Sequence, residues 1–383
     1  MKNLHAEVSV AQLCKNGEEL CGDKVEISHS REQVTVVLSD GLGSGVKANI
    51  LATLTTKIAS SMLGRGISMD DVVDTIARTL PVCRERKIAY ATFHILTVTS
   101  DGLATVIEFD CPKTLLLRAG RAIPFPTDER IIGGKTVQAG QLALQEGDMV
   151  VLVSDGIIHA GIGGLLPLGW GWKEIANHLE LEMPTFSNSD KLCQSLLGCC
   201  EGYYLGKPGD DSTVVALKLR KPRQLTLMVG PPSDTSRDEA IVLDLISRPG
   251  VKVVSGGTTA NIVSRVAAKA LKVDLTYHDS LIPPIGYIEG IDLVTEGVLT
   301  LNAAVERLES PRILKSSNRK DGATLLAKIL MDTDHVDILA GGAVNPAHQN
   351  PLLPAQMNIK FQVLSRLRNA LESLGKIVAI EWV

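Results

Sequence analysis

One short stretch constrains this chain more than any other: an apolar run that ends in an aspartate and a glycine-rich turn. Residues 34–38 are β-branched or apolar, a composition typical of a buried strand. Asp40 follows at the predicted strand end, and three of the next five residues are glycine: Gly41, Gly43 and Gly45. A carboxylate on a rigid strand end, beside a backbone that a ligand can approach closely, favours a metal ion or a phosphate. Taken alone, the pattern also fits an ordinary turn.

Further acidic residues stand at the ends of other predicted strands. A second apolar run leads into Ser154-Asp155-Gly156, Asp210 and Asp211 precede a third strand, and Asp23 precedes a fourth. Hard divalent cations prefer several oxygen ligands and keep positions open for water, so these acidic strand ends predict a site for two such ions. The eight histidines form no H-x-x-x-H pair, which disfavours most zinc hydrolases.

Taken in chain order, the motifs GD, SDGLGSG, SDG and DDST resemble those of the metal-dependent PPM (PP2C-like) serine/threonine phosphatases. The branch that they resemble most is the SpoIIE/RsbU/RsbX type of bacterial regulatory phosphatase. The resemblance covers residues 5–220. It implies a PP2C-like α/β sandwich of antiparallel sheets and helices, and a cofactor of two Mn²⁺ or Mg²⁺ ions.

The resemblance also implies roles for individual residues. Asp40 is expected to bridge the two metal ions, and the full set of expected metal ligands is Asp23, Asp40, Gly41 (through its carbonyl), Asp155, Asp210 and Asp211. Of the adjacent pair, Asp210 aligns with the family ligand and Asp211 is kept as the alternate. Asp40, Asp155 and Asp210 are the expected catalytic residues. No arginine is an obvious candidate for binding the substrate phosphate. Lys15, Lys24 and Lys47 are the basic residues that could do so, and none of them is selected.

Two helices are predicted directly after the glycine turn. The first spans residues 46–63, with Leu54 expected on its inner face, and Ser68 begins the second with Asp71 three residues on, a capping-box pattern. Pro81 is expected to end it. In the SpoIIE-type family, adjacent helices at this place control activity, so the pair is expected to act as a switch. Residues 161–188 form an insertion with one helix, either a flap over the site or a packing element.

A basic, proline-containing joint at residues 219–224 predicts a domain boundary, with a phosphatase domain over 1–220 and a second domain over 225–383. In the second, strand and helix patterns alternate, for example a strand at 225–229 and a helix at 236–247. That rhythm predicts a doubly wound parallel α/β, Rossmann-like domain. Its expected role is regulatory, through binding of a ligand or a partner.

Within this second domain, Gly256, Gly257, Thr258 and Thr259 stand between a predicted strand and a predicted helix through Leu271. Bare N–H groups at a helix N-terminus with two hydroxyls predict an anion site. The motif is neither a Walker loop nor the G-x-G-x-x-G pattern. It resembles the phosphate loops of sugar-phosphate isomerases and DeoR-type effector domains, and a tight turn without ligand is the alternative. Residues 341–345 and Glu296 are expected to line, together with this loop, the crevice at the carboxyl ends of the parallel strands.

The composition of the chain limits which partners it is expected to bind and where in the cell it is expected to act. The net charge of −4 and an aromatic content of 3% argue against nucleic acid and anionic membranes as partners. No apolar run is long enough to span a membrane, and the start shows no secretory pattern. Seven cysteines at scattered spacings indicate reduced, mostly buried thiols rather than disulfides or zinc ligands. A cytoplasmic protein is expected, with a homodimer left open.

These observations predict a metal-dependent protein serine/threonine phosphatase with a C-terminal sensor domain. By the resemblance, its substrate is phosphoserine or phosphothreonine on a small bacterial regulatory protein, such as an anti-sigma-factor antagonist. Two alternatives remain: a signalling scaffold with weak phosphatase activity, and a small-molecule phosphatase whose second domain holds the substrate.

Overall fold

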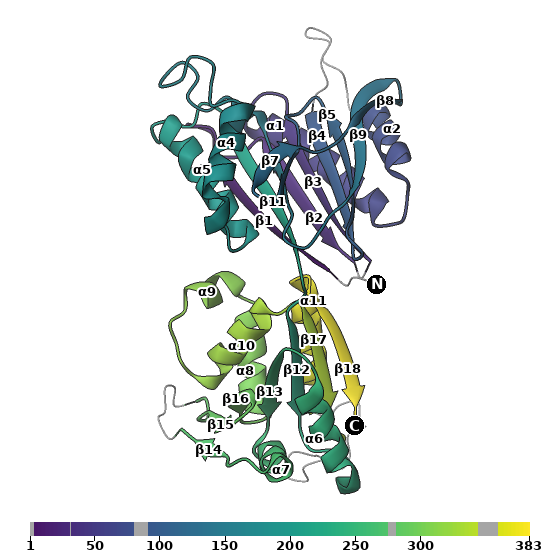
Figure 1. Ribbon diagram of the computed structural model, residues 1–383, viewed down its shortest axis with the longest axis vertical. Helices are drawn as coiled ribbons and strands as arrows, with labels where there is room; N and C mark the ends of the chain where they lie inside the picture. Colours follow the sequence, from purple (N-terminus) through teal and green to yellow (C-terminus); the bar gives the residue numbers. More distant parts are fainter. Residues whose placement is uncertain (1–3, 31, 80–90, 275–280, 344–358) are drawn as a thin grey trace. The chain divides into compact units, whose positions relative to one another are not determined.

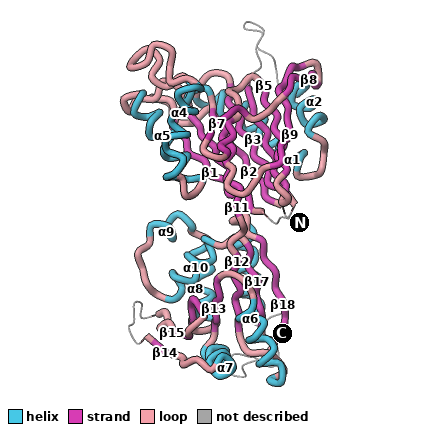
Figure 2. The backbone as a smooth tube through the Cα atoms, in the orientation of Figure 1, coloured by secondary structure: helices cyan, strands magenta, loops and turns pink. Residues whose placement is uncertain are grey.

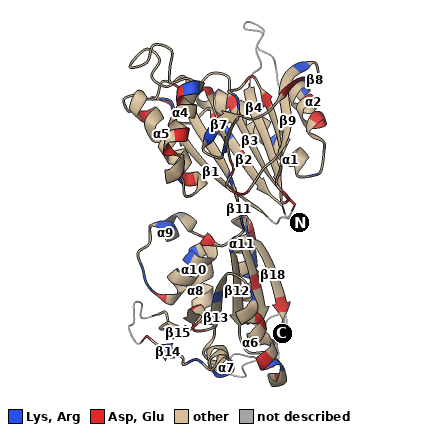
Figure 3. Cartoon of the chain, viewed as in Figure 1, with Lys and Arg blue, Asp and Glu red and all other residues tan. Residues whose placement is uncertain are grey.

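The computed structural model describes residues 4–30, 32–79, 91–274, 281–343 and 359–383. The chain divides into two compact units, an N-terminal unit of residues 1–221 and a C-terminal unit of residues 222–383 (Figure 1). Among the described helices, none combines the length and apolarity needed to cross a bilayer. Figure 3 shows that acidic and basic residues are interspersed along the chain in both units.

The N-terminal unit is built on two antiparallel sheets. The first has the order β2-β3-β4-β5-β9-β8, with bounds Asp23–His29, Gln33–Gly41, Ala91–Thr99, Leu103–Phe109, Lys135–Ala143 and Asp128–Ile132. The second has the order β1-β11-β10-β6-β7, with bounds His5–Leu13, Ser212–Arg220, Met149–Val153, Leu115–Arg118 and Arg121–Pro124. Apolar side chains of both sheets form one buried cluster, for example Val36, Leu96, Leu116 and Val215. The sheets therefore pack face to face.

Helices cover the outer face of each sheet. Helices α1 (Gly45–Leu63) and α2 (Met69–Thr79) share a buried cluster with the first sheet. Helices α4 (Trp172–Glu182) and α5 (Ser189–Tyr203) share one with the second, while α3 (Asp155–Ile158) follows β10 directly. Two sheets between two helical layers confirm the expected α/β sandwich (Figure 2). A short 3-10 helix, η1 (Met183–Thr185), joins α4 to the loop before α5.

The helix pair has the predicted start but not the predicted inner face. The Ser68 hydroxyl donates to Asp71 at 2.6 Å and accepts the Asp71 N–H at 3.2 Å, so the capping pattern is confirmed. Leu54, however, is 49% exposed, which corrects its expected burial. The buried face of α1 carries small residues such as Ala48 and Ala52, which allow the helix to lie close to the sheet. Pro81 lies outside the described residues.

The insertion after β10 is partly a packing element. Trp170, Ile175 and Leu179 are buried against the second sheet with α5, so the helix of the insertion belongs to the core. The preceding loop is different, because Ile162 and Leu168 are exposed. A flap role for this loop stays a prediction.

The C-terminal unit contains a seven-stranded mixed sheet in the order β14-β15-β16-β13-β12-β17-β18. Five strands run parallel: β12 (Gln224–Val229), β13 (Val251–Ser255), β16 (Ile291–Thr295), β17 (His335–Ala340) and β18 (Ile377–Trp382). Two antiparallel edge strands, β14 (Lys272–Val273) and β15 (Gly286–Ile288), correct the expectation of a wholly parallel sheet.

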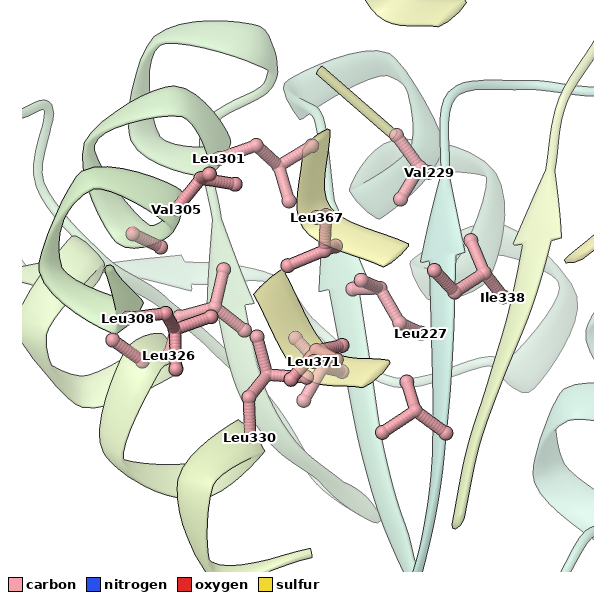
Figure 4. Close-up of a cluster of buried hydrophobic side chains, with 14 of the residues drawn as sticks. Leu227, Val229, Leu301, Val305, Leu308, Leu326, Leu330, Ile338, Leu367 and Leu371 are labelled. Carbon is pink, nitrogen blue, oxygen red and sulfur yellow. The ribbon is translucent and has the colours of Figure 1, made fainter. Parts of the chain in front are cut away.

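Helices lie on both faces of this sheet, which makes the unit doubly wound. Helices α8 (Val298–Leu308), α10 (Gly322–Asp332) and α11 (Ile359–Ser373) pack on one face, where leucines from the helices meet Leu227 and Ile338 of the sheet (Figure 4). Helices α6 (Asp238–Ser247) and α7 (Gly257–Ala267) pack on the other. Two short helices, η2 (Thr235–Arg237) and α9 (Pro311–Ser316), were not predicted.

Helix α7 is shorter than the sequence predicts. Ala268 has a φ of +52° in the left-handed region, and this conformation ends the helix before the expected Leu271.

Candidate metal centre

The predicted acidic residues come together where strands of both sheets end. Asp23 of β2 lies directly opposite Asp40 of β3 in the antiparallel register. Asp155 follows β10 and Asp210 precedes β11, and these two strands pair with Val153 opposite Val214. Electrostatic interactions join the two sets, because Asp23, Asp155 and Asp210 all act to raise the pKa of Asp40.

Hydrogen bonds between the two sheets hold this edge in place. The Thr213 hydroxyl of β11 donates to Asp23 Oδ2 at 2.6 Å. The Asp211 carboxylate accepts the backbone N–H of Lys15 and that of Gly22, each at 2.9 Å. The strand end that carries Asp210 is therefore tied to the turn that leads into Asp23.

The cluster brings four carboxyl groups together in a partly buried place. Burial, and then repulsion from Asp23 and Asp155, raises the pKa of Asp40 to about 9. Burial also raises the pKa of Asp23 to about 6, against the lowering effect of the Thr213 hydroxyl. Burial and Asp155 raise the pKa of Asp210. Within the described parts of the chain, no basic side chain forms an ion pair with any of these four aspartates.

The donor set fits hard divalent cations. Asp23 is 1% exposed, and its Oδ1 atom is buried without a hydrogen-bond partner among the described residues. A buried carboxylate oxygen without a donor is costly unless a cation compensates it. Carboxylate oxygens around such an atom are ligands that Mn²⁺ and Mg²⁺ accept. The residues present therefore fit the metal ions implied by the motifs.

Gly41 connects the cluster to the helix pair. A Cβ atom at this position would lie 2.1 Å from the Ala48 carbonyl oxygen of α1, so the contact admits only glycine. The bare backbone thus brings α1 against the end of the strand that carries Asp40. The expected role of the Gly41 carbonyl as a metal ligand stays a prediction.

The adjacent aspartates 210 and 211 have different surroundings. The Asp211 side chain is buried, and both its oxygens accept backbone N–H groups. Asp210 is half-buried and interacts electrostatically with Asp155 and Asp40. This geometry favours Asp210 over Asp211 as the ligand beside Asp155.

Sequence reasoning left three basic residues open as neighbours of the cluster: Lys15, Lys24 and Lys47. The positive charge of Lys15 acts to lower the pKa of Asp210, which favours Lys15. Lys15 stands in the turn between β1 and β2, and its backbone is fixed by Asp211. Nothing in the sequence around Lys15 indicates that this turn lies near Asp210.

The predicted anion loop of the C-terminal unit has mixed features. Gly256, with a φ of +121°, precedes α7, and the buried Thr259 hydroxyl has no partner among the described residues. A Cβ atom on Gly257 would lie 3.4 Å from a Glu296 carboxylate oxygen, so Glu296 lies close to this loop, as expected. A carboxylate there competes with an incoming anion for the N-terminus of α7. Anion binding at Gly256, Gly257, Thr258 and Thr259 stays a prediction.

The crevice at the carboxyl ends of the parallel strands lies where the strand order reverses. From β12, the chain proceeds to β13 and β16 on one side and to β17 and β18 on the other. Gly230 and Gly341 follow the two strands at this switch point, where doubly wound folds bind ligands. Lys360 Nζ donates to the carbonyl oxygens of Gly341 at 2.6 Å and Ala343 at 3.0 Å. Residues 344 and 345 lie outside the described residues.

The N-terminal unit is therefore a sandwich of two antiparallel sheets with a carboxylate cluster where strands of both sheets end. Residues 30–220 match the family model described as "Stage II sporulation protein E (SpoIIE)". The N-terminal unit is a PP2C-type serine/threonine phosphatase domain of the SpoIIE/RsbU branch.

Several solved structures are similar to this chain at low identity. The phosphatase domain of SpoIIE from Bacillus subtilis is 18% identical, with a TM-score of 0.44 over 58% of this chain and 95% of that one. A structure of RsbU and RsbW domains from Mycobacterium tuberculosis is 18% identical, with a TM-score of 0.48 over 63% and 68%. RsbX in complex with magnesium is 17% identical, with a TM-score of 0.42 over 56% and 96%. No curated protein sequence matches this chain.

Proposed function

We propose that the chain is a Mn²⁺- or Mg²⁺-dependent protein phosphatase that hydrolyses phosphoserine or phosphothreonine. The observation that carries this proposal is the meeting of Asp23, Asp40, Asp155 and Asp210 from the ends of four strands in two sheets. A family match over residues 30–220 supports the same activity. Two ions, when bound, supply Lewis acidity and a water molecule of lowered pKa.

The residues of the chain have separate tasks in this proposal. Asp40 is the acid whose pKa is raised by Asp23, Asp155 and Asp210 together, and it is the residue that would hold both ions. Asp155 and Asp210 would hold one ion and Asp23 the other. Thr213 orients Asp23 by its hydrogen bond to Oδ2, and Oδ1 of Asp23 is left without a hydrogen-bond partner among the described residues. Asp211 positions Asp210 and the turn at Lys15 through its two backbone hydrogen bonds.

The proposed substrate is a phosphorylated bacterial regulatory protein, and the proposed place of action is the cytoplasm. Turnover of p-nitrophenyl phosphate with Mn²⁺, compared with turnover of a panel of phosphoproteins, tests this. Faster hydrolysis of a phosphoprotein supports the proposal. Turnover confined to small phosphate esters favours a small-molecule phosphatase, and no metal-dependent turnover favours a scaffold.

The C-terminal unit is proposed to bind a small anionic ligand or a partner protein and to regulate the phosphatase, with a homodimer left open. A doubly wound sheet with its switch point between β12 and β17 supports ligand binding. Anion binding by the loop before α7 needs its own test, because the helix N-terminus there favours an anion whereas the nearby Glu296 carboxylate disfavours one.

We expect that replacement of Lys15 by alanine weakens substrate binding. The Lys15 ammonium is the positive charge that acts on Asp210, and a phosphoryl group entering the cluster needs such a charge. KM for p-nitrophenyl phosphate should rise by about 10-fold, which corresponds to about 1.4 kcal/mol of lost binding. Lys24→Ala is the matched control, because residues 23 and 24 of β2 point to opposite faces of the sheet. Equal effects of the two substitutions would contradict a role for Lys15.

If the loop at residues 256–259 binds an anion, phosphate or a sugar phosphate should raise the melting temperature of the C-terminal unit in the full chain. A ligand at ~100 times its dissociation constant stabilises the native state by roughly 2.7 kcal/mol, which is several degrees. Gly257→Val should remove the shift, because its side chain extends into the space between the loop and Glu296. Glu296→Gln should increase the shift by removing the competing charge. A wild-type protein that responds to none of these anions would show that the loop is a turn.

A further inference from the structure

Two cysteines and a buried carboxylate lie together beside the candidate metal centre but outside it. The ligand atoms of Cys14, Cys21 and Asp211 all lie within 4.8 Å of one another. Cys14 is exposed and Cys21 is half-buried, whereas Asp211 is 3% exposed. The two cysteines flank the turn between β1 and β2, and Asp211 precedes β11. Of the six described cysteines only Cys193 and Cys200 are buried, so the thiols are less buried than the sequence led us to expect.

The chemistry of this cluster differs from that of the neighbouring carboxylates. Two sulfur atoms and one carboxylate oxygen are ligands typical of zinc, whereas Mg²⁺ and Mn²⁺ prefer oxygen alone. Zinc–sulfur bonds of about 2.3 Å and zinc–oxygen bonds of about 2.0 Å place tetrahedral ligand atoms less than about 4 Å apart. Atoms within 4.8 Å of one another reach this geometry by small movements of the side chains.

The three side chains are held together by the backbone. Asp211 accepts the N–H of Lys15, the residue after Cys14, and the N–H of Gly22, the residue after Cys21. Both cysteines are therefore fixed beside the same carboxylate before any ion binds. In the described parts of the chain no basic side chain pairs with Asp211, so its charge is available to a cation. The exposure of Cys14 gives an ion access from solvent.

We propose that Cys14, Cys21 and Asp211 bind one zinc ion, with water as the fourth ligand. As the two zinc–sulfur bonds form, each thiol releases its proton to solvent, and no electron is transferred. The ion links the turn that leads into Asp23 with the residue that follows Asp210. It thereby fixes two segments that carry candidate ligands of the hard cations, without being one of those cations.

The test is a titration of the reduced full chain with Co²⁺ and then Zn²⁺, with Mg²⁺ in excess to occupy the carboxylate centre. One equivalent of Co²⁺ should produce a thiolate-to-cobalt absorption band in the near ultraviolet, and Zn²⁺ should displace it. Cys14→Ser and Cys21→Ser should each abolish the band and weaken zinc binding by at least about 100-fold. Cys199→Ser, a half-buried cysteine outside the cluster, is the matched control and should keep both.

Absence of a thiolate band in the wild-type protein would overturn the proposal, as would an unchanged band in both cluster variants. A disulfide between Cys14 and Cys21, recovered from fresh protein that binds no zinc after reduction, would also overturn it. None of these measurements uses phosphatase activity, so their outcome is independent of the proposed function.

Discussion

Asp40→Asn is expected to abolish metal-dependent phosphatase activity while the fold survives. Asparagine keeps the shape of the side chain but loses the negative charge that would hold two cations between Asp23 and Asp155. Lewis-acid activation is worth several kcal/mol, so turnover of p-nitrophenyl phosphate should fall by roughly 1,000-fold or more. The measurement is initial rate against Mn²⁺ concentration for the variant and the wild type. A variant with full Mn²⁺-dependent turnover would show that the centre is misassigned.

Although Asp40→Asn should remove activity, it is expected to stabilise the metal-free protein at neutral and alkaline pH. Because the folded-state pKa of Asp40 is raised to about 9 from an ordinary 3.8, the folded protein binds a proton that the unfolded chain has released. Stability should therefore fall as the pH rises from about 4 toward 9 in the presence of a chelator. Asp40→Asn should flatten this fall and raise the melting temperature near pH 8. Saturating Mn²⁺ should flatten it in the wild type, because cations favour the charged form.

Gly41→Ala is expected to be nearly as damaging, for a steric reason. The added Cβ atom would lie 2.1 Å from the Ala48 carbonyl oxygen and 2.6 Å from its carbon, both backbone atoms of α1. Either α1 or the strand end that carries Asp40 must move. Overpacking of this kind costs about 1–3 kcal/mol, and displacement of Asp40 should reduce turnover by about 100-fold. The melting temperature of the N-terminal unit and its Mn²⁺ affinity are the measurements.

Gly198→Ala provides the control for Gly41→Ala. Gly198 lies in α5, and a Cβ atom there would meet nothing within 4 Å. This variant should be as active as the wild type and slightly more stable, since alanine favours a helix over glycine by about 0.5–1 kcal/mol. Wild-type Mn²⁺ affinity and turnover in Gly41→Ala would contradict the coupling of α1 to Asp40.

The helix pair α1 and α2 shows which features of a helix can be predicted from periodicity and which cannot. The bounds of α1 and the capping of α2 by Ser68 were predictable, because both depend on residues near in sequence. The buried face of α1 was not, since Leu54 is apolar yet exposed while Ala48 and Ala52 face the sheet. Close approach of a helix to a sheet selects small residues, and hydrophobicity alone gives the opposite assignment.

In the C-terminal unit, the alternation of strands and helices predicted the doubly wound sheet, because each unit of strand and helix is local. The antiparallel pair β14 and β15 was missed, since their strands are two and three residues long. Gly256 and Glu296 were both noted in the sequence. Gly256 and Glu296 follow the neighbouring strands β13 and β16. Only the pairing of these two strands shows that a carboxylate lies beside the loop expected to bind an anion.

The acidic residues of the candidate site were predictable from the sequence alone, because each stands at the end of an apolar strand and the order of the motifs is recognisable. Tertiary structure decided everything that depends on contacts between distant segments. Asp211 turned out to bind the backbone at Lys15 and Gly22, which separates its role from that of Asp210. The meeting of Cys14 and Cys21 with the same carboxylate has no sequence signature, because the cysteines are spaced unlike zinc ligands and Asp211, just before β11, is distant from both along the chain.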